Sequence, residues 1–135
     1  MIEAISVEAG RDPSSVPEVT HVAYDRWTLR VTCLFEKRRG PVYVDFEDVA
    51  GIRVLDENQL LEFWAPESRP LGWLWEIAKG GWFSLEGMRE GFTLQHMAYD
   101  KAGERRLREF LVLGINDCVG VLAWTEPRVI ATSER

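Results

Sequence analysis

The sequence predicts a β-rich α+β protein, built on one antiparallel, strongly curled sheet or half-barrel with one or two short helices. Residues 27–35 alternate between apolar and polar side chains, which is typical of a strand with one buried face. Two continuous apolar runs, Phe110–Leu113 and Val119–Trp124, flank Gly114–Asp117, whose residue types favour a tight turn. Because these runs do not alternate, we expect both faces of this hairpin to be covered, at the centre of a sheet.

The first half of the chain contains most of the predicted strands. Residues 1–18 are expected to form a short edge strand and then a mobile loop with two prolines. A strand over Thr20–Ala23 and a turn at Asp25-Arg26 follow. The alternating residues Trp27–Phe35 then pair with Val42–Glu47 in a hairpin whose first strand directs Trp27, Leu29, Val31, Cys33 and Phe35 to one face.

The middle of the chain holds a predicted helix. A strand over Val49–Leu55 leads into Asp56-Glu57-Asn58-Gln59, which has a capping-box pattern. Asp56–Trp64 is therefore interpreted as a short helix, and a strand is the alternative because Leu61, Phe63 and Ala65 also alternate. The remaining predicted strands are Leu71–Ala78, Trp82–Leu85, Phe92–Tyr99 and Arg128–Ala131.

Length and charge indicate one acidic domain over residues 1–135. Sixteen Lys and Arg residues against 22 Asp and Glu give a net charge of −6, which repels nucleic acid and anionic membranes but suits a basic protein partner. The first residues lack the pattern of a secretion signal, and no apolar run could span a bilayer. Cys33 and Cys118 lie within predicted strands as inert packing residues, so a cytoplasmic location is expected.

Residues for chemistry are sparse, and no catalytic, cofactor-binding or metal-binding site is predicted. Asp45 and Glu47 are two residues apart on a predicted strand, so both carboxylates leave the same face of the sheet. The favoured interpretation is that this face is exposed to solvent. His96 is one of only two histidines, and neither has a second ligand at metal-binding spacing. A hydrolase that uses Asp45 and Glu47, or His96, is the third functional hypothesis.

Three segments carry a resemblance to a family. They are His21-Val-Ala-Tyr-Asp25, Val44-Asp-Phe-Glu-Asp-Val49 and Phe110–Trp124 with Asn116-Asp117-Cys118. Their order and hydrophobic pattern resemble small acidic β-rich bacterial proteins of the polymorphic-toxin immunity type. The resemblance implies a non-enzymatic protein that blocks a toxin by binding it. For a basic nuclease toxin, the implied contact residues are Asp45, Glu47, Asp56, Glu57 and Glu62.

Two classes of binding function therefore come before the hydrolase. The first is a non-enzymatic interaction protein, with a protein partner or a second copy of the chain. The second is a small-molecule binding module whose pocket is lined by tryptophans; its candidate residues are Trp73, Trp75 and Trp82.

Overall fold

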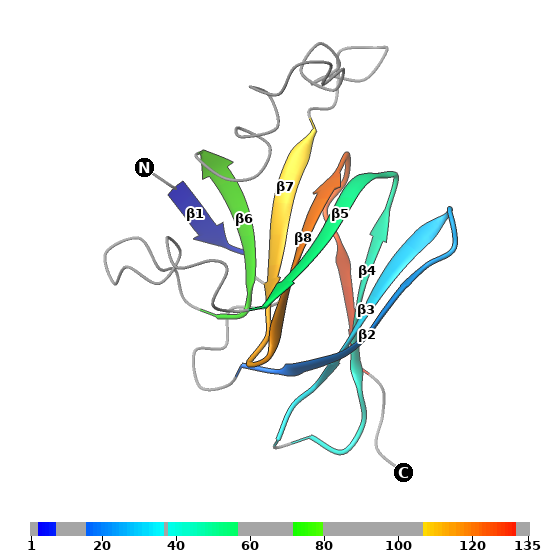
Figure 1. Ribbon diagram of the computed structural model, residues 1–135, viewed down its shortest axis with the longest axis vertical. Coiled ribbons are helices and arrows are strands. Elements are labelled where there is room, and N and C mark those ends of the chain that lie inside the picture. The colour runs from blue at the N-terminus through cyan, green and yellow to red at the C-terminus, as the bar shows by residue number, and fades with distance from the viewer. Residues whose placement is uncertain (1–2, 8–15, 37, 57–71, 80–106, 132–135) are drawn as a thin grey trace.

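The computed structural model describes residues 3–7, 16–36, 38–56, 72–79 and 107–131. In this part of the chain every regular element is a β-strand, and the strands pair antiparallel (Figure 1). The strands are β1 (Glu3–Ser6), β2 (Glu18–Tyr24), β3 (Thr28–Leu34), β4 (Val42–Glu47), β5 (Val49–Asp56), β6 (Leu74–Lys79), β7 (Arg108–Leu113), β8 (Asp117–Ala123) and β9 (Arg128–Ala131).

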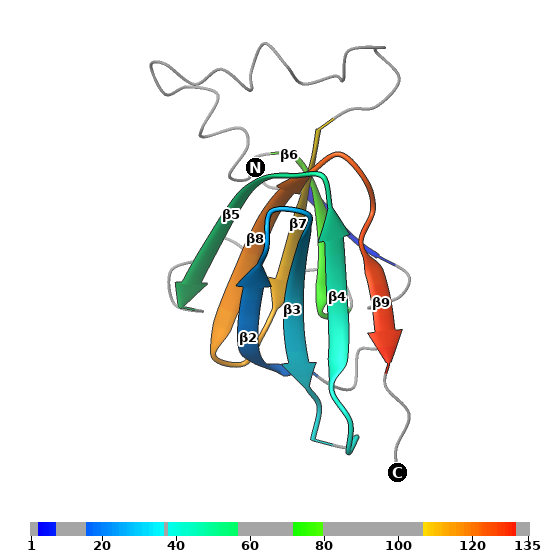
Figure 2. The same cartoon turned by 90° about the vertical axis from the view of Figure 1, so that its right-hand side faces the viewer.

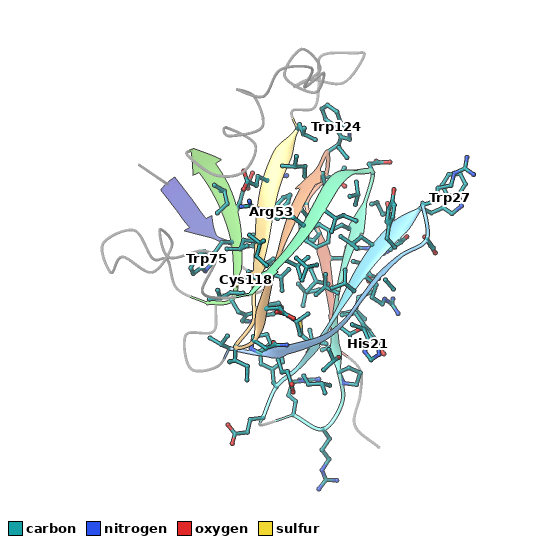
Figure 3. The ribbon with its side chains drawn as sticks, viewed as in Figure 1. His21, Trp27, Arg53, Trp75, Cys118 and Trp124 are labelled. Atoms are coloured by element: carbon teal, nitrogen blue, oxygen red, sulfur yellow. The ribbon has the colours of Figure 1, made fainter. Side chains whose placement is uncertain are left out.

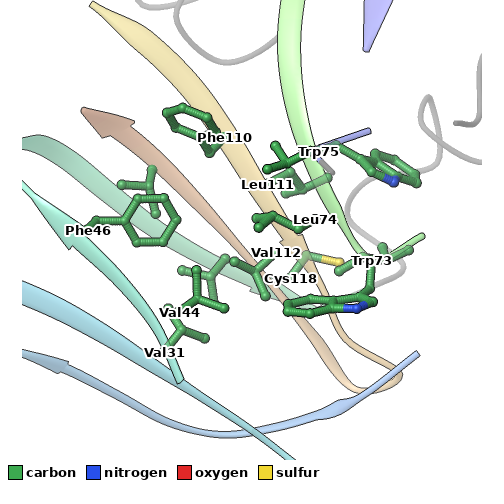
Figure 4. Close-up of a cluster of buried hydrophobic side chains, with 14 of the residues drawn as sticks. Val31, Val44, Phe46, Trp73, Leu74, Trp75, Phe110, Leu111, Val112 and Cys118 are labelled. Atoms are coloured by element: carbon green, nitrogen blue, oxygen red, sulfur yellow. The ribbon is translucent and has the colours of Figure 1, made fainter. Parts of the chain in front are cut away.

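The strands form two sheets that lie face to face. A five-stranded sheet has the order β1-β6-β7-β8-β5, and a four-stranded sheet has the order β2-β3-β4-β9 (Figure 2). Ring contacts join the layers: Phe46 of β4 lies 5.8 Å from Phe110 of β7, between ring centroids. Phe35, just after β3, lies 5.3 Å from Trp73, which precedes β6. One part of the core therefore sits between the two sheets, and a second part, with Trp75 and Leu111, is buried on the other face of the five-stranded sheet (Figure 4).

The predicted α+β class, with a strongly curled sheet or half-barrel and short helices, is wrong. The described residues form two separate antiparallel sheets and no helix. The chain changes sheets at Asp48, whose φ of 53° lies in the left-handed region. After Asp48, β5 pairs with β8 of the other layer, whereas a curled sheet would pair it with β4. Trp124 N–H donates to the Asp48 carbonyl at 3.3 Å and supports this crossing.

The predicted strands are confirmed where the structure describes them. β1 is an edge strand, and β3 and β4 form the predicted hairpin. The inward residues of this hairpin are buried: Leu29, Val31, Cys33, Val42, Val44 and Phe46. Of the predicted helix Asp56–Trp64, Asp56 is the last residue of β5, and the rest lies outside the described residues. The predicted strands Trp82–Leu85 and Phe92–Tyr99 also lie outside them.

The hairpin of β7 and β8 is central and buried on both faces, as its apolar runs predict. Phe110 and Val112 face the four-stranded sheet, and Leu111 and Leu113 point to the opposite side. All four side chains are at most 4% exposed. β6 and β5 flank the hairpin, so the main chains of both of its strands are paired within the sheet.

The turn of this hairpin is tied to β2 in the other sheet. The Asn116 side-chain oxygen accepts from Val19 N–H at 3.1 Å, and its Nδ2 donates to the Val19 carbonyl at 3.0 Å. Ile115 N–H donates to the Pro17 carbonyl at 2.9 Å. Gly114 allows this approach, because a Cβ there would lie 2.8 Å from Cγ2 of Val19. The turn therefore sets the position of β2 over the five-stranded sheet.

We expect Asn116→Ala to lower the free energy of unfolding by about 1–2 kcal/mol, because the Val19 main chain loses both partners. Asn116→Asp is expected to cost more at neutral pH, since a carboxylate can accept from Val19 N–H but faces the Val19 carbonyl without a proton to donate. Urea unfolding followed by tryptophan fluorescence measures both. Wild-type stability in either variant would contradict the role of this amide.

Candidate interaction site

The predicted contact residue Asp45 is buried in an ion pair. Its side chain is 4% exposed, and Nε and Nη2 of Arg30 donate to its two oxygens, each at 2.8 Å. The Arg30 guanidinium also lies 4.2 Å from the centroid of the Tyr43 ring. The hydrogen bond to Asp45 raises the pKa of Arg30, so the guanidinium stays charged. Both oxygens of the Asp45 carboxylate are thus bound to Arg30, on the outer face of the four-stranded sheet.

Of the three predicted acids that the structure describes, Asp45, Glu47 and Asp56, it brings Asp45 and Glu47 together. They share a face, as expected, but Arg30 and Arg128 lie opposite Asp45 on the two neighbouring strands. Glu47 is 59% exposed and lies 3.5 Å from Arg128. Asp56 ends β5, and Glu57 and Glu62 lie outside the described residues. Positive charge from the neighbouring strands therefore offsets the described part of the acidic group.

The described tryptophans of the proposed pocket are packed in the protein. Trp75 is fully buried, with Nε1 donating to the Gly72 carbonyl at 3.2 Å, and Trp73 is 4% exposed (Figure 4). Trp82 lies outside the described residues, as does His96. Trp73 and Trp75 act as core residues.

Groups for metal binding do not assemble in the part of the chain that the structure describes, and one described thiol is unreactive. There, no three His, Cys, Asp or Glu residues are grouped to hold a metal ion. Burial raises the pKa of the Cys33 thiol to about 12, so it stays protonated and is a poor nucleophile at neutral pH. Within the same residues, no helix is long and apolar enough to cross a membrane.

Among the described residues, the most exposed large apolar side chain lies at the turn between β2 and β3. Trp27 is 72% exposed (Figure 3), and Tyr24, the last residue of β2, is 52% exposed. The alternating pattern predicts Trp27 on the buried face, but β3 begins one residue later, at Thr28, and Trp27 belongs to the turn. We call Tyr24, Arg26 and Trp27 the tip.

Hydrogen bonds fix the conformation of the tip. Oδ1 of Asp25 accepts from the main-chain N–H groups of Trp27 at 3.0 Å and Thr28 at 2.9 Å. Asp25 N–H donates to the Thr28 carbonyl at 3.2 Å, which closes a two-residue turn. Hydrogen bonds from Thr28 and then Trp27 lower the pKa of Asp25, so its carboxylate is ionised at neutral pH.

Arg26 occupies a position in this turn that glycine would adopt at lower cost. Its φ is 86°, in the region that residues with a side chain rarely enter. Its guanidinium lies 5.1 Å from the centroid of the Trp27 ring, within range of a cation–π contact. The tip therefore presents an arginine in contact with a tryptophan, on a turn whose backbone conformation is costly for a residue with a side chain.

Comparisons of this chain with models of protein families, with curated proteins and with solved structures found no match. The sequence indicates the turn itself through Asp25-Arg26. An Asp followed two residues later by an aromatic, just before an alternating strand, is the signal from which the exposure of Trp27 could have been inferred.

We expect the Asp25 carboxyl group to titrate below its ordinary value of 3.8 in the folded protein. Its ionised form accepts the two N–H groups, so its contribution to stability is complete above the unfolded-state value and is lost as the pH falls through the folded-state pKa. NMR titration of the Asp25 carboxyl carbon measures this pKa. The Trp27 indole resonance should shift with the same midpoint.

An Asp25 midpoint at or above 3.8, or an indole resonance that does not move with it, would mean that this carboxylate does not hold the turn.

Proposed function

We propose that this chain is a non-enzymatic protein that binds another protein through the tip. The observation that carries the proposal is the 72% exposure of Trp27 in a turn whose backbone is fixed by Asp25. An exposed indole costs free energy in water, and a partner that covers it recovers that cost. The tip lies at the end of the β2–β3 hairpin, where a partner can reach it (Figure 3).

The chemistry of the tip supports this proposal. Trp, Tyr and Arg are the residue types that dominate the energetics of protein interfaces. The hydrogen bonds of Asp25 order the turn before binding, so less conformational entropy is lost when the partner docks. The stacked guanidinium of Arg26 suits an apolar pocket on the partner with an acidic group at its rim.

The two alternative functions find less support. A hydrolase that uses Asp45 and Glu47 would need a carboxylate that is already bound to Arg30. A small-molecule pocket lined by Trp73 and Trp75 would need side chains that are buried in the core.

We extend the proposal to a toxin-neutralising role in a bacterial cytoplasm. The net charge of −6 favours encounter with a basic partner. The exposed Glu47 is a further candidate contact for such a partner. The buried thiols Cys33 and Cys118 suit a reducing compartment.

The tip is tested with Trp27→Ser and a matched control, Ile115→Ser. Ile115 is also exposed, at 57%, but lies in the β7–β8 turn, so both variants replace an exposed apolar side chain. Each protein is immobilised and exposed to an extract of the source cells, and retained proteins are quantified by mass spectrometry. A partner should be retained by wild type and Ile115→Ser and lost with Trp27→Ser.

Calorimetry with the purified partner then gives the affinity. Trp27→Ser should raise Kd roughly 30-fold or more, as expected for an interface residue that contributes about 2 kcal/mol. A partner that binds Trp27→Ser and wild type equally well would show that the tip is not the contact.

A further inference from the structure

The two sheets end differently on the flank that carries β2 and β5. The four-stranded sheet ends at β2, which lies against β8, whereas the five-stranded sheet continues beyond β8 to β5. Figure 2 shows β5 extending past the edge that β2 forms. No described strand lies opposite β5, so among the described strands the four-stranded sheet ends one strand earlier than the five-stranded sheet on this flank.

Apolar side chains face this position from both sheets. Ile52 and Val54 share the face of Phe110 and Val112, toward the four-stranded sheet, and Val54 is 47% exposed. Val22 and Tyr24 lie opposite the buried residues Val31 and Leu29, so they share the inner face of β3. Their exposed fractions are 36% and 52%. Two edge strands therefore leave apolar surface uncovered on the same flank.

The main chain of β2 also presents hydrogen-bonding groups on this edge. The Thr28 carbonyl accepts from Asp25 N–H, so the main-chain groups of Thr28 point toward β2. Because these directions alternate along a strand, those of Leu29 and Val31 point toward β4. Their partners in the register, Tyr24 and Val22, consequently direct N–H and C=O away from β3 and off the edge of the sheet.

The side-chain amide of Asn116 makes the pair of hydrogen bonds to β2 that a neighbouring strand would make. It accepts from Val19 N–H and donates to the Val19 carbonyl, as the main chain of a neighbouring strand would. The β2 irregularity between Val19 and His21 lies at this capped end. Beyond it, residues 21–24 carry no Lys, Asp, Glu or Pro, the residues that usually protect a sheet edge.

We propose that a partner binds by adding one extended segment to β2 as a fifth strand of this sheet, opposite β5. The segment, of roughly five residues, bonds to the main chain of Val22 and Tyr24. It directs alternate apolar side chains onto Ile52 and Val54. This inference rests on the proposed function, since the tip, at the end of the same strand, binds the same partner.

The space beside β2 accommodates one strand better than a second copy of this chain. Antiparallel pairing of two β2 strands about a two-fold axis would place β5 of one copy where β8 of the other lies. An isolated extended segment meets no such clash, and backbone pairing with alternate side chains in pockets is an established mode of peptide recognition.

A peptide library tests the mode of binding. Displayed nine-residue peptides, with Val, Ile, Leu or Phe alternating with Thr, Ser, Lys or Glu, are selected against the whole protein. A selected peptide is then N-methylated at one position at a time. Methyl groups at every second position should lower affinity about tenfold or more, because only these N–H groups face β2. The positions between should change little.

Val22→Pro tests the edge from the side of the protein. It removes an N–H that points away from β3, so the β2–β3 ladder and the thermal unfolding midpoint should be retained. Affinity for the selected peptide should fall about tenfold or more. The matched control is Ala131→Pro, which removes the equivalent outward N–H from β9 on the other edge of the same sheet. It should leave peptide affinity unchanged.

In the peptide experiments, strand addition would be overturned by a library with no peptide selected above background, by N-methyl sensitivity without a period of two, or by full peptide affinity in Val22→Pro. Self-association that Val22→Pro abolishes would assign the edge to a second copy and also overturn it. Loss of partner capture in Trp27→Ser with full capture in Val22→Pro would leave the proposed function standing and remove only this inference. Peptide binding with N-methyl sensitivity at every second position, but with no partner whose capture depends on Trp27, would support strand addition and remove the proposed function of the tip.

Discussion

Two hydrogen bonds between the Asn116 amide and the main chain of Val19 set where one sheet ends over the other. They act together with the close approach of Gly114, which leaves no room for a Cβ against Val19. The turn of the central hairpin is thereby fixed beneath the start of β2. Because β8 then lies under β2, the outer strand β5 has no counterpart among the described strands of the other sheet. The flank that we propose as a binding surface follows from this one attachment.

The same amide divides the edge of β2 into two halves. At Val19 the edge is satisfied and interrupted by the irregularity before His21, so another strand cannot pair there. At Val22 and Tyr24 the main-chain N–H and C=O groups point off the edge of the sheet, and no charged side chain protects them. An open edge usually exposes a protein to aggregation. A short open stretch limits that hazard, since only a short segment can pair with it.

The sequence determines the local elements of this fold more clearly than their partners. The consecutive apolar runs of β7 and β8 and the alternation in β3 and β4 predict these strands, because burial of a strand leaves its period in the sequence. Which sheet β5 joins depends on the backbone at Asp48, a residue type common in any polar turn. The assignment to α+β with a single curled sheet fails at that residue.

In the candidate site, too, the sequence predicts which residues share a face but not which partners they meet. Asp45 and Glu47 do share a face, as their spacing predicts, but the register places Arg30 beside Asp45 and turns a predicted contact into an ion pair. Trp27 continues the alternation of β3, so a pattern alone places it in the core. A hydrogen bond from its own N–H to Asp25 instead assigns it to the turn. Such partners come from tertiary geometry, which a periodic pattern does not encode.

Strand addition and the tip would contribute differently to recognition. Main-chain hydrogen bonds to Val22 and Tyr24 are available to almost any extended segment, so they give affinity with little choice of sequence. Discrimination must come from side chains, and the tip places an indole and a guanidinium at one end of the added strand. A partner that offers a strand without a pocket for Trp27 leaves the indole in water and gains only the main-chain bonds. Because the turn that carries Trp27 directly follows Tyr24, the last residue of β2, a segment added to this edge ends near the tip, which makes the tip the selective part of the site and the edge its general part.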